Sequence, residues 1–114
     1  MKVFANTDVG LVRQLNEDDY CIAHNANDEW MAIVCDGIGG AKAGEVASHT
    51  AVMTMYEAFM KSPVFEKDRQ VDNWIRENLN QANDFIYSKS LKNFNERGMG
   101  TTAVGVIKAH IGTF

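Results

Sequence analysis

The order of sequence patterns along this chain of 114 residues predicts an α+β fold. Short apolar runs come first, two long stretches with helical periodicity follow, and a β-branched run comes last. Strands and helices that are segregated along the chain in this way are typical of α+β proteins. Apolar residues make up 46% and charged residues 23%, as in soluble globular proteins. We expect residues 1–114 to belong to one domain.

Three apolar runs predict the first strands. Met1–Ala5 and Tyr20–Ala23 are short, and the polar residues 24–29 predict a turn before the third run. Trp30–Cys35 is apolar without interruption, which is typical of a strand that is buried on both faces. We expect residues 36–40 to end that strand.

Two helices are predicted from apolar residues at three- and four-residue steps. The first runs from about Gly44 to Lys61, where the apolar positions form one broad face. Ser62-Pro63 ends it, because proline disfavours helical geometry in the residue before it. The second runs from about Asp68 to Asn93, with polar residues largely on the other side.

The last part of the chain predicts a return to the sheet. Residues 95–98 indicate a loop, and the β-branched run Thr101–Ile107 indicates a strand. Residues 109–114 look like a turn into another strand. A sheet that stopped there would leave an unpaired edge, so we expect more chain after Phe114.

Charge and composition exclude several functions. With 11 basic and 15 acidic residues the net charge is -4, whereas binding to a phosphate backbone needs a basic surface. No apolar run approaches the roughly 20 residues of a membrane span, and the chain turns polar too early for a signal peptide. We expect a cytoplasmic protein that binds neither nucleic acid nor membrane.

The two cysteines, Cys21 and Cys35, each lie in an apolar stretch. A disulfide framework or a zinc site would need more cysteines, or cysteine and histidine at ligand spacing. We therefore expect buried free thiols.

The run that reaches Asp36 and continues into Gly37, Gly39 and Gly40 is the strongest local pattern for chemistry. A carboxylate at a strand tip is held by a rigid element, and glycines let backbone groups approach a ligand closely. Such an arrangement suits a hard cation, which takes carboxylate, carbonyl and water oxygens. A tight turn whose aspartate hydrogen-bonds its own backbone would give the same pattern.

A second polar run covers residues 13–19 (RQLNEDD). It fits either a solvated loop or a site in which some residues hold metal-bound waters and another binds a phosphoryl group. In such a site Glu17 and Asp18 would hold metal-bound waters, and Arg13 would offer a bidentate hydrogen-bond donor to a phosphoryl group. Neither run by itself is specific for a metal site, but the two runs together are.

Three runs resemble, in order, the motifs of the PPM family of metal-dependent protein phosphatases, particularly its bacterial members. They are residues 7–18 (TDVGLVRQLNED), 34–48 (VCDGIGGAKAGEVAS) and 98–103 (GMGTTA). A helical segment of family-like length separates the second from the third. The resemblance implies a β-sandwich of two mostly antiparallel sheets flanked by antiparallel helix pairs. Residues 1–114 would be the incomplete N-terminal part of one catalytic domain, with half of the sandwich and one helical layer.

The resemblance also implies roles for five residues. Asp36 would bridge two divalent cations, and Gly37 would supply a backbone carbonyl to one of them. Glu17 and Asp18 would organise the metal-bound waters, and Arg13 would bind the substrate phosphate. Oxygen ligands favour Mn²⁺ or Mg²⁺ over Zn²⁺.

The activity so implied is that of a protein serine/threonine phosphatase. Paired cations lower the pKa of a shared water, so that no side-chain nucleophile is needed. The expected substrates are phosphoserine and phosphothreonine proteins, and the expected functional counterpart is a Ser/Thr protein kinase in bacterial signalling.

The sequence leaves two possible roles for His49. In the family a histidine just beyond the second motif can protonate the leaving alcohol, and His49 follows that motif directly. His49 falls within the first predicted helix, however, so we favour a role in helix packing.

The chain departs from the family in its length. Family members are longer, and their further metal-binding aspartates follow in later motifs, including a Gly-Asp-Ser-Arg run that is absent here. We therefore expect these residues alone to be inactive. They are either part of a longer phosphatase or a short form, for which a phosphoprotein-binding or regulatory role without catalysis is the alternative. A purely structural module that binds no metal is a third possibility.

Overall fold

The computed structural model describes residues 9–13, 18–38, 41–92 and 100–114. Its elements are β1 (Val9–Arg13), β2 (Asp18–His24), β3 (Trp30–Ile38), α1 (Ala41–Met60), α2 (Asp68–Lys92), β4 (Gly100–Ala109) and β5 (Gly112–Thr113). This order confirms the α+β prediction. The predicted strand at Met1–Ala5 and the predicted loop at residues 95–98 lie outside the described residues.

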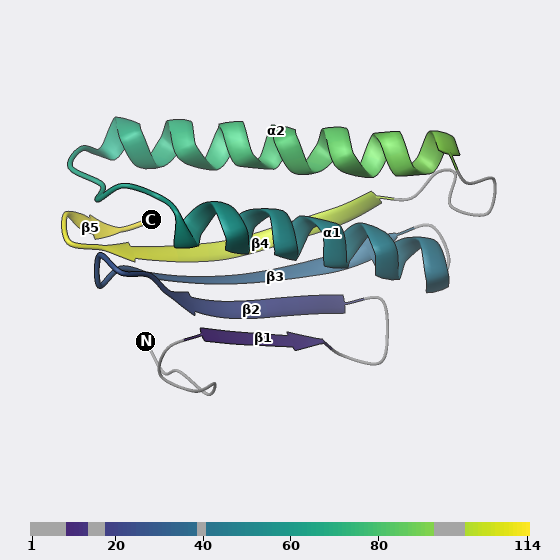
Figure 1. Cartoon of the computed structure of the whole chain (residues 1–114), viewed down its shortest axis with the longest axis horizontal. Helices are drawn as coiled ribbons and strands as arrows, with labels where there is room; N and C mark the ends of the chain where they lie inside the picture. The colour runs from purple at the N-terminus through teal and green to yellow at the C-terminus, as the bar shows by residue number, and fades with distance from the viewer. Residues whose placement is uncertain (1–8, 14–17, 39–40, 93–99) are drawn as a thin grey trace.

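The five strands form one antiparallel sheet in the order β1-β2-β3-β4-β5 (Figure 1). Both helices are inserted between β3 and β4, yet these two strands are neighbours. The chain leaves the sheet after Ile38 and returns at Gly100, and the Cα atoms of these two residues pair with each other. The helical pair is therefore an excursion from one end of the sheet that returns to the same end.

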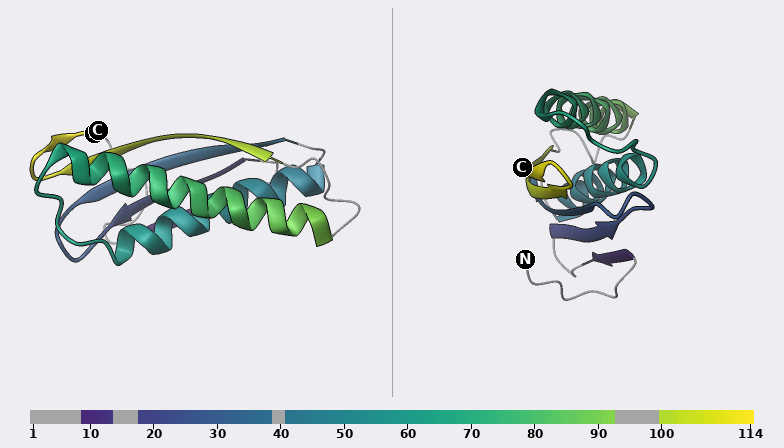
Figure 2. Two further views of the ribbon diagram at one scale, coloured as in Figure 1. Left: turned by 90° about the horizontal axis from the view of Figure 1, so that it is seen from above. Right: turned by 90° about the vertical axis from the view of Figure 1, so that its left-hand side faces the viewer.

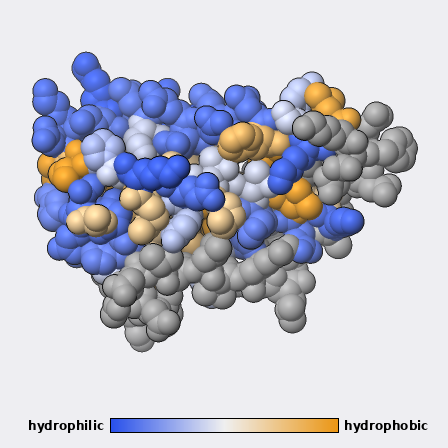
Figure 3. Space-filling model, in the orientation of Figure 1, coloured by the Kyte–Doolittle hydropathy of each residue, from blue (hydrophilic) through white to orange (hydrophobic). Residues whose placement is uncertain are grey.

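Helix α1 covers one face of the sheet, and α2 packs against α1 beside β4 (Figures 1 and 2). The two helices run antiparallel, as predicted. Small buried residues let α1 lie close to the strands: Ala43, Ala47 and Ala51 are all at most 3% exposed. Phe59 and Trp74 join the helices through an edge-to-face ring contact at 5.9 Å between centroids. Over the helices the surface is mostly hydrophilic (Figure 3).

Burial alternates along β3, so within the described residues the strand is buried on one face and not, as predicted, on both. Met31 and Ile33 are buried beneath α1, whereas Val34 and Ile38 are 52% and 55% exposed. On the same open face β4 carries Val104, which is 72% exposed. A continuous apolar run predicts cover on both faces, but the described helices cover only one.

Strand β3 also runs further than predicted. It does not end at Cys35 but continues through Asp36 to Ile38, because β4 pairs with it along this whole length. Strand β2 likewise begins at Asp18 rather than Tyr20. The solvated-loop interpretation of residues 13–19 is therefore wrong for the part that lies in β1 and β2.

The helix boundaries follow local signals. Helix α1 begins at Ala41, three residues before the expected Gly44, and ends at Met60 close to the predicted end. Helix α2 begins at Asp68, as predicted, with an acidic residue in its first turn. The side chain of Gln70 accepts a hydrogen bond of 3.0 Å from the backbone N–H of Lys67, as in a capping box.

A buried polar cluster closes the end of the molecule where β3 begins. Asn25 Nδ2 donates to the carbonyl oxygen of Phe59 at 3.2 Å. The buried carboxylate of Glu29 accepts from the backbone N–H groups of Phe65 at 3.5 Å and His110 at 3.3 Å. The cluster joins the β2–β3 turn, the α1–α2 connection and the β4–β5 turn. It therefore fixes the far end of α1 on the sheet.

Candidate metal centre

One aspartate from each of the first two motifs lies at the same end of the sheet. Asp18 opens β2, and its Cα pairs with that of Asp36 on β3. Arg13 is the last residue of β1, and its Cα pairs with that of Asp19. Antiparallel pairing thus brings the predicted site residues Arg13, Asp18 and Asp36 to the same end of the sheet. The register places positions 18 and 36 on one face and position 13, paired with position 19, on the other. The fourth predicted residue, Glu17, lies outside the described residues.

Asp36 is exposed on the face of the sheet that α1 leaves open. Its backbone carbonyl accepts a hydrogen bond of 3.1 Å from the side-chain hydroxyl of Thr101 on β4. The aspartate is thus held in a paired strand rather than in a turn, so the tight-turn alternative is wrong. An exposed carboxylate on a rigid strand is available to a cation from solvent.

Gly37 lies directly against α1. A Cβ at this position would be 1.9 Å from the carbonyl oxygen of Gly44, a distance that real Cβ atoms do not reach. Only glycine at position 37 therefore allows the first turn of α1 to approach the strand this closely. The sequence argument missed Gly44, although a glycine inside a helical pattern is a signal for close packing.

His49 belongs to the opposite face of the sheet from Asp36. Its Nδ1 lies 2.7 Å from Oδ2 of Asp19, which is 1% exposed between α1 and the strands. Asp19 pairs with Cys35 and Asp36 is the next residue along β3, so positions 19 and 36 fall on opposite faces. The position of His49 supports the expected packing role and gives no support to a role as acid beside Asp36.

The two cysteines are free and buried beneath α1, as predicted. Burial, and to a lesser degree the neighbouring Cys35, raises the pKa of Cys21 to about 12. Burial and the Asp19 carboxylate raise the pKa of Cys35 to about 11, although a hydrogen bond with the Thr101 side chain acts in the other direction. Both thiols stay protonated at neutral pH, so neither is a nucleophile in the folded protein.

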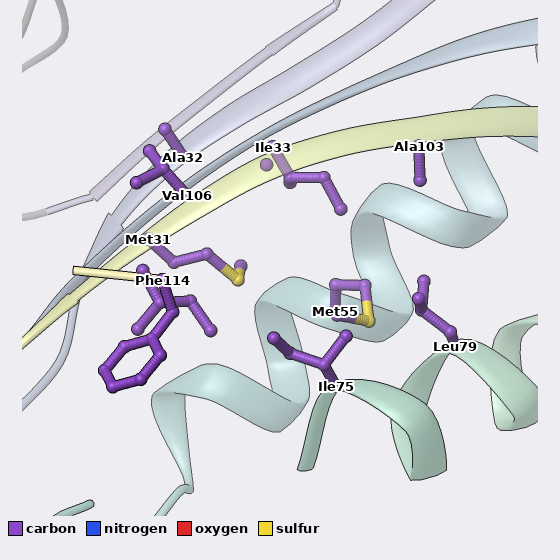
Figure 4. A pocket seen from close by; sticks show the side chains of 11 residues that line it. Met31, Ala32, Ile33, Met55, Ile75, Leu79, Ala103, Val106 and Phe114 are labelled. Carbon is purple, nitrogen blue, oxygen red and sulfur yellow. The ribbon is translucent and has the colours of Figure 1, made fainter. Parts of the chain in front are cut away.

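A cavity of about 160 Å³ lies between the sheet and the helices (Figure 4). Met31, Met55, Ile75 and Phe114 are among the residues that line it, and the lining is apolar. A phosphate or a metal ion would find no charged partner on these side chains.

Among the described residues no three or more His, Cys, Asp or Glu side chains are grouped to hold a metal ion. No helix in the described ranges is long and apolar enough to span a membrane.

This fold is similar to that of bacterial phosphatases of known structure. The crystal structure of the Staphylococcus aureus phosphatase Stp1 matches with a TM-score of 0.76 and 30% identity, over 96% of this chain and 45% of that one. The family model described as protein phosphatase 2C matches residues 10–113. The chain therefore belongs to the protein phosphatase 2C family, which confirms the resemblance drawn from the motifs.

Curated relatives agree with this assignment. The serine/threonine phosphatase stp of Listeria welshimeri is 33% identical over 103 residues, which are 90% of this chain and 41% of that protein. The protein phosphatase PhpP of Streptococcus pneumoniae strain D39 is 32% identical over 102 residues, again 90% of this chain and 41% of that protein. The chain thus spans about two fifths of the length of these relatives.

Proposed function

We propose that residues 1–114 form the N-terminal part of the catalytic domain of a protein serine/threonine phosphatase. The whole protein would hydrolyse phosphoserine and phosphothreonine in proteins with a metal-activated water. The observation that carries the proposal is the cross-strand pairing of Asp18 with Asp36 at the end of the sheet where Arg13 ends β1. Membership in a family of protein phosphatases supports it.

The residues at this end of the sheet fit a hard divalent cation such as Mn²⁺ or Mg²⁺, because they offer oxygen donors on paired strands. Asp36 would bridge two cations, and the carbonyl of Gly37 would bind one of them. Glu17 and Asp18 would hold the metal-bound waters. When bound, the cations lower the pKa of a water and stabilise charge on the phosphoryl oxygens.

The chain's own groups would bind the substrate and keep the ligands in place. Arg13 would bind the phosphate through its planar fork of N–H donors. Thr101 holds the backbone of Asp36 from β4, and the contact with Gly44 fixes the strand at Gly37 from α1. The ligand strand is thereby held from two sides before any metal binds, which is what a preorganised site requires.

The remaining metal ligands are expected outside these residues, since the chain spans 41% of the length of its relatives. We infer that these residues alone are inactive, and that the whole protein opposes a Ser/Thr protein kinase in the cytoplasm. A phosphoprotein-binding or regulatory module without catalysis is the second candidate. It would keep the Arg13 end of the sheet and lack a complete set of metal ligands.

Release of phosphate from a phosphothreonine peptide in the presence of Mn²⁺ tests the proposal. Residues 1–114 and a form extended by the downstream coding sequence should be compared. We expect activity only in the extended form. Asp36→Asn should lower it by more than about 100-fold, beyond the 10–100-fold typical of changes around a metal site.

Asp28→Asn is the matched control, because Asp28 is an exposed aspartate in the turn at the other end of β3. It should keep full activity. Full activity of the extended Asp36→Asn form would refute the metal bridge. Binding of the phosphopeptide without hydrolysis by the extended wild type would favour the module without catalysis.

A further inference from the structure

A hydrogen bond between His49 and Asp19 joins α1 to the strand that begins with Asp18. Asp19, the second residue of β2, has its carboxylate buried between the sheet and the helix. Its Oδ2 lies 2.7 Å from Nδ1 of His49, whose side chain is 40% exposed. A carboxylate accepts and does not donate, so the ring nitrogen carries the proton. Hydrogen bonds to charged groups of this kind are stronger than neutral ones.

The bond completes a closed set of three contacts around the proposed metal centre. Strand β3 is held to α1 where Gly37 meets Gly44. Helix α1 is held to β2 by the bond between His49 and Asp19. Strand β2 is paired with β3 where Asp18 faces Asp36. Helix α1, which lies on the opposite face of the sheet from Asp36, thus contacts both strands next to the paired positions 18 and 36.

We infer that His49 and Asp19 are a positioning pair that holds the start of β2, and with it Asp18, in register with Asp36. Strand ends open locally more readily than strand centres, and the described part of β2 begins only one residue before Asp19. The bond from His49 on α1 to Asp19 therefore restrains β2 at its first residues, where local opening is easiest. The catalytic meaning of the pair rests on the proposed function, but its effect on the strand does not.

A second bond of the same chemistry supplies a matched control. His24 Nε2 lies 2.6 Å from Oδ1 of Asp28 at the opposite end of β2. His24→Phe and His49→Phe each keep an aromatic ring of similar size and remove the hydrogen-bonding nitrogens. His49→Asn returns a donor close to the place of the ring Nδ1. A general effect of losing a histidine–aspartate bond would appear in both Phe variants, whereas a positioning effect would appear only at residue 49.

Two measurements test the inference. The first is amide hydrogen exchange of Asp18, Asp19 and Tyr20 in the 114-residue chain. His49→Phe should speed their exchange about five- to tenfold, the factor expected for one hydrogen bond, and His49→Asn should restore most of the protection. The second is the affinity of the extended form for Mn²⁺ alone, read from the electron paramagnetic resonance signal of the free ion. His49→Phe should weaken it about tenfold, at the low end for a change around a metal site.

His24→Phe should change neither reading. Unchanged exchange at residues 18–20 in His49→Phe, or an equal change there in His24→Phe, would overturn the inference. Faster exchange with unaltered Mn²⁺ affinity would show a packing role only and would also overturn it. If the extended wild type bound no Mn²⁺, the proposed function would fail while the exchange measurement still decided whether the pair holds the strand. Should His49→Phe not fold, His49→Ala removes the same bond without the bulk of the ring.

Discussion

Gly37 on β3 and Gly44 on α1 pack backbone against backbone, with no room for a side chain between them. This contact sets how closely the helix lies on the strand that carries Asp36. It lies directly beneath the proposed metal centre, so it links the packing of the domain to the geometry of the site.

Gly37→Ala should therefore destabilise the protein. The added Cβ would overlap the carbonyl oxygen of Gly44, and relief requires α1 to move away from β3. We expect the free energy of unfolding to fall by about 3 kcal/mol, the upper part of the usual range for overpacking, as measured by urea denaturation. Gly100→Ala is the control, because a Cβ there would meet no atom within 4 Å. Equal stability of the two variants would contradict the close contact.

Glu29→Ala should destabilise the opposite end of the fold. The carboxylate accepts backbone hydrogen bonds from Phe65 and His110, and its loss leaves both donors without that acceptor. A buried donor without a partner costs about 1–3 kcal/mol, so we expect a loss of about 2–3 kcal/mol in urea denaturation. Glu57→Ala, an exposed position on α1, should stay within about 0.5 kcal/mol of the wild type. A loss below 1 kcal/mol for Glu29→Ala would show that these bonds contribute little.

The buried thiols predict a loss of stability in alkaline solution. The pKa values of Cys21 and Cys35 are raised from 9.0 to about 12 and about 11. Between pH 9 and 11 the unfolded chain releases these protons while the folded chain keeps them, so unfolding becomes more favourable as pH rises. The expected slope is up to about 1 kcal/mol per pH unit for each thiol.

Urea denaturation at pH 8 and pH 10 measures this slope. A Cys21→Ala/Cys35→Ala variant should show a shallower dependence, because the two thiols no longer titrate. Tyrosine and lysine titrate in the same range and remain in both proteins, so only the difference between the proteins counts. An identical slope in both would refute the effect of burial on these thiols.

The open face of the sheet makes a prediction about the whole protein. Val104 is 72% exposed, whereas Ile107 on the same strand is 3% exposed beneath the helices. In residues 1–114, Val104→Ser should cost less than about 1 kcal/mol and Ile107→Ser about 3 kcal/mol or more. In the extended form Val104→Ser should cost about 2 kcal/mol, because a second sheet would bury this side chain. An equal cost in both forms would argue against the sandwich.

Much of the fold could be predicted because its signals are local. Helix α2 was expected at residues 68–93 and occupies Asp68–Lys92, since its apolar spacing and its first-turn residues all lie within the helix itself. Strand β3 was expected to begin at Trp30 and does so. Its end was missed, because residues 36–38 are held by pairing with β4, more than 60 residues further along the chain.

For the candidate site, too, some features could be predicted from local motifs and others could not. The motifs alone predicted a site from Arg13, Glu17, Asp18, Asp36 and Gly37, because family resemblance is carried by residue types and spacing. They gave a role to Asp18 and none to its neighbour Asp19, which is buried and bonded to His49. Adjacent residues of a strand point to opposite faces, and which face is covered depends on a helix that follows later in the chain.

The sequence by itself determined the family, the helices and the acidic residues of the proposed centre, because these depend on neighbours within a few positions. Only the tertiary structure decided that Asp18 pairs with Asp36, that Gly44 presses on Gly37 and that His49 reaches Asp19. Each of these is a contact between two different secondary-structure elements, even where, as for Gly37 and Gly44, the residues are close in the chain. Their formation depends on how the sheet and α1 pack together, which no local pattern records.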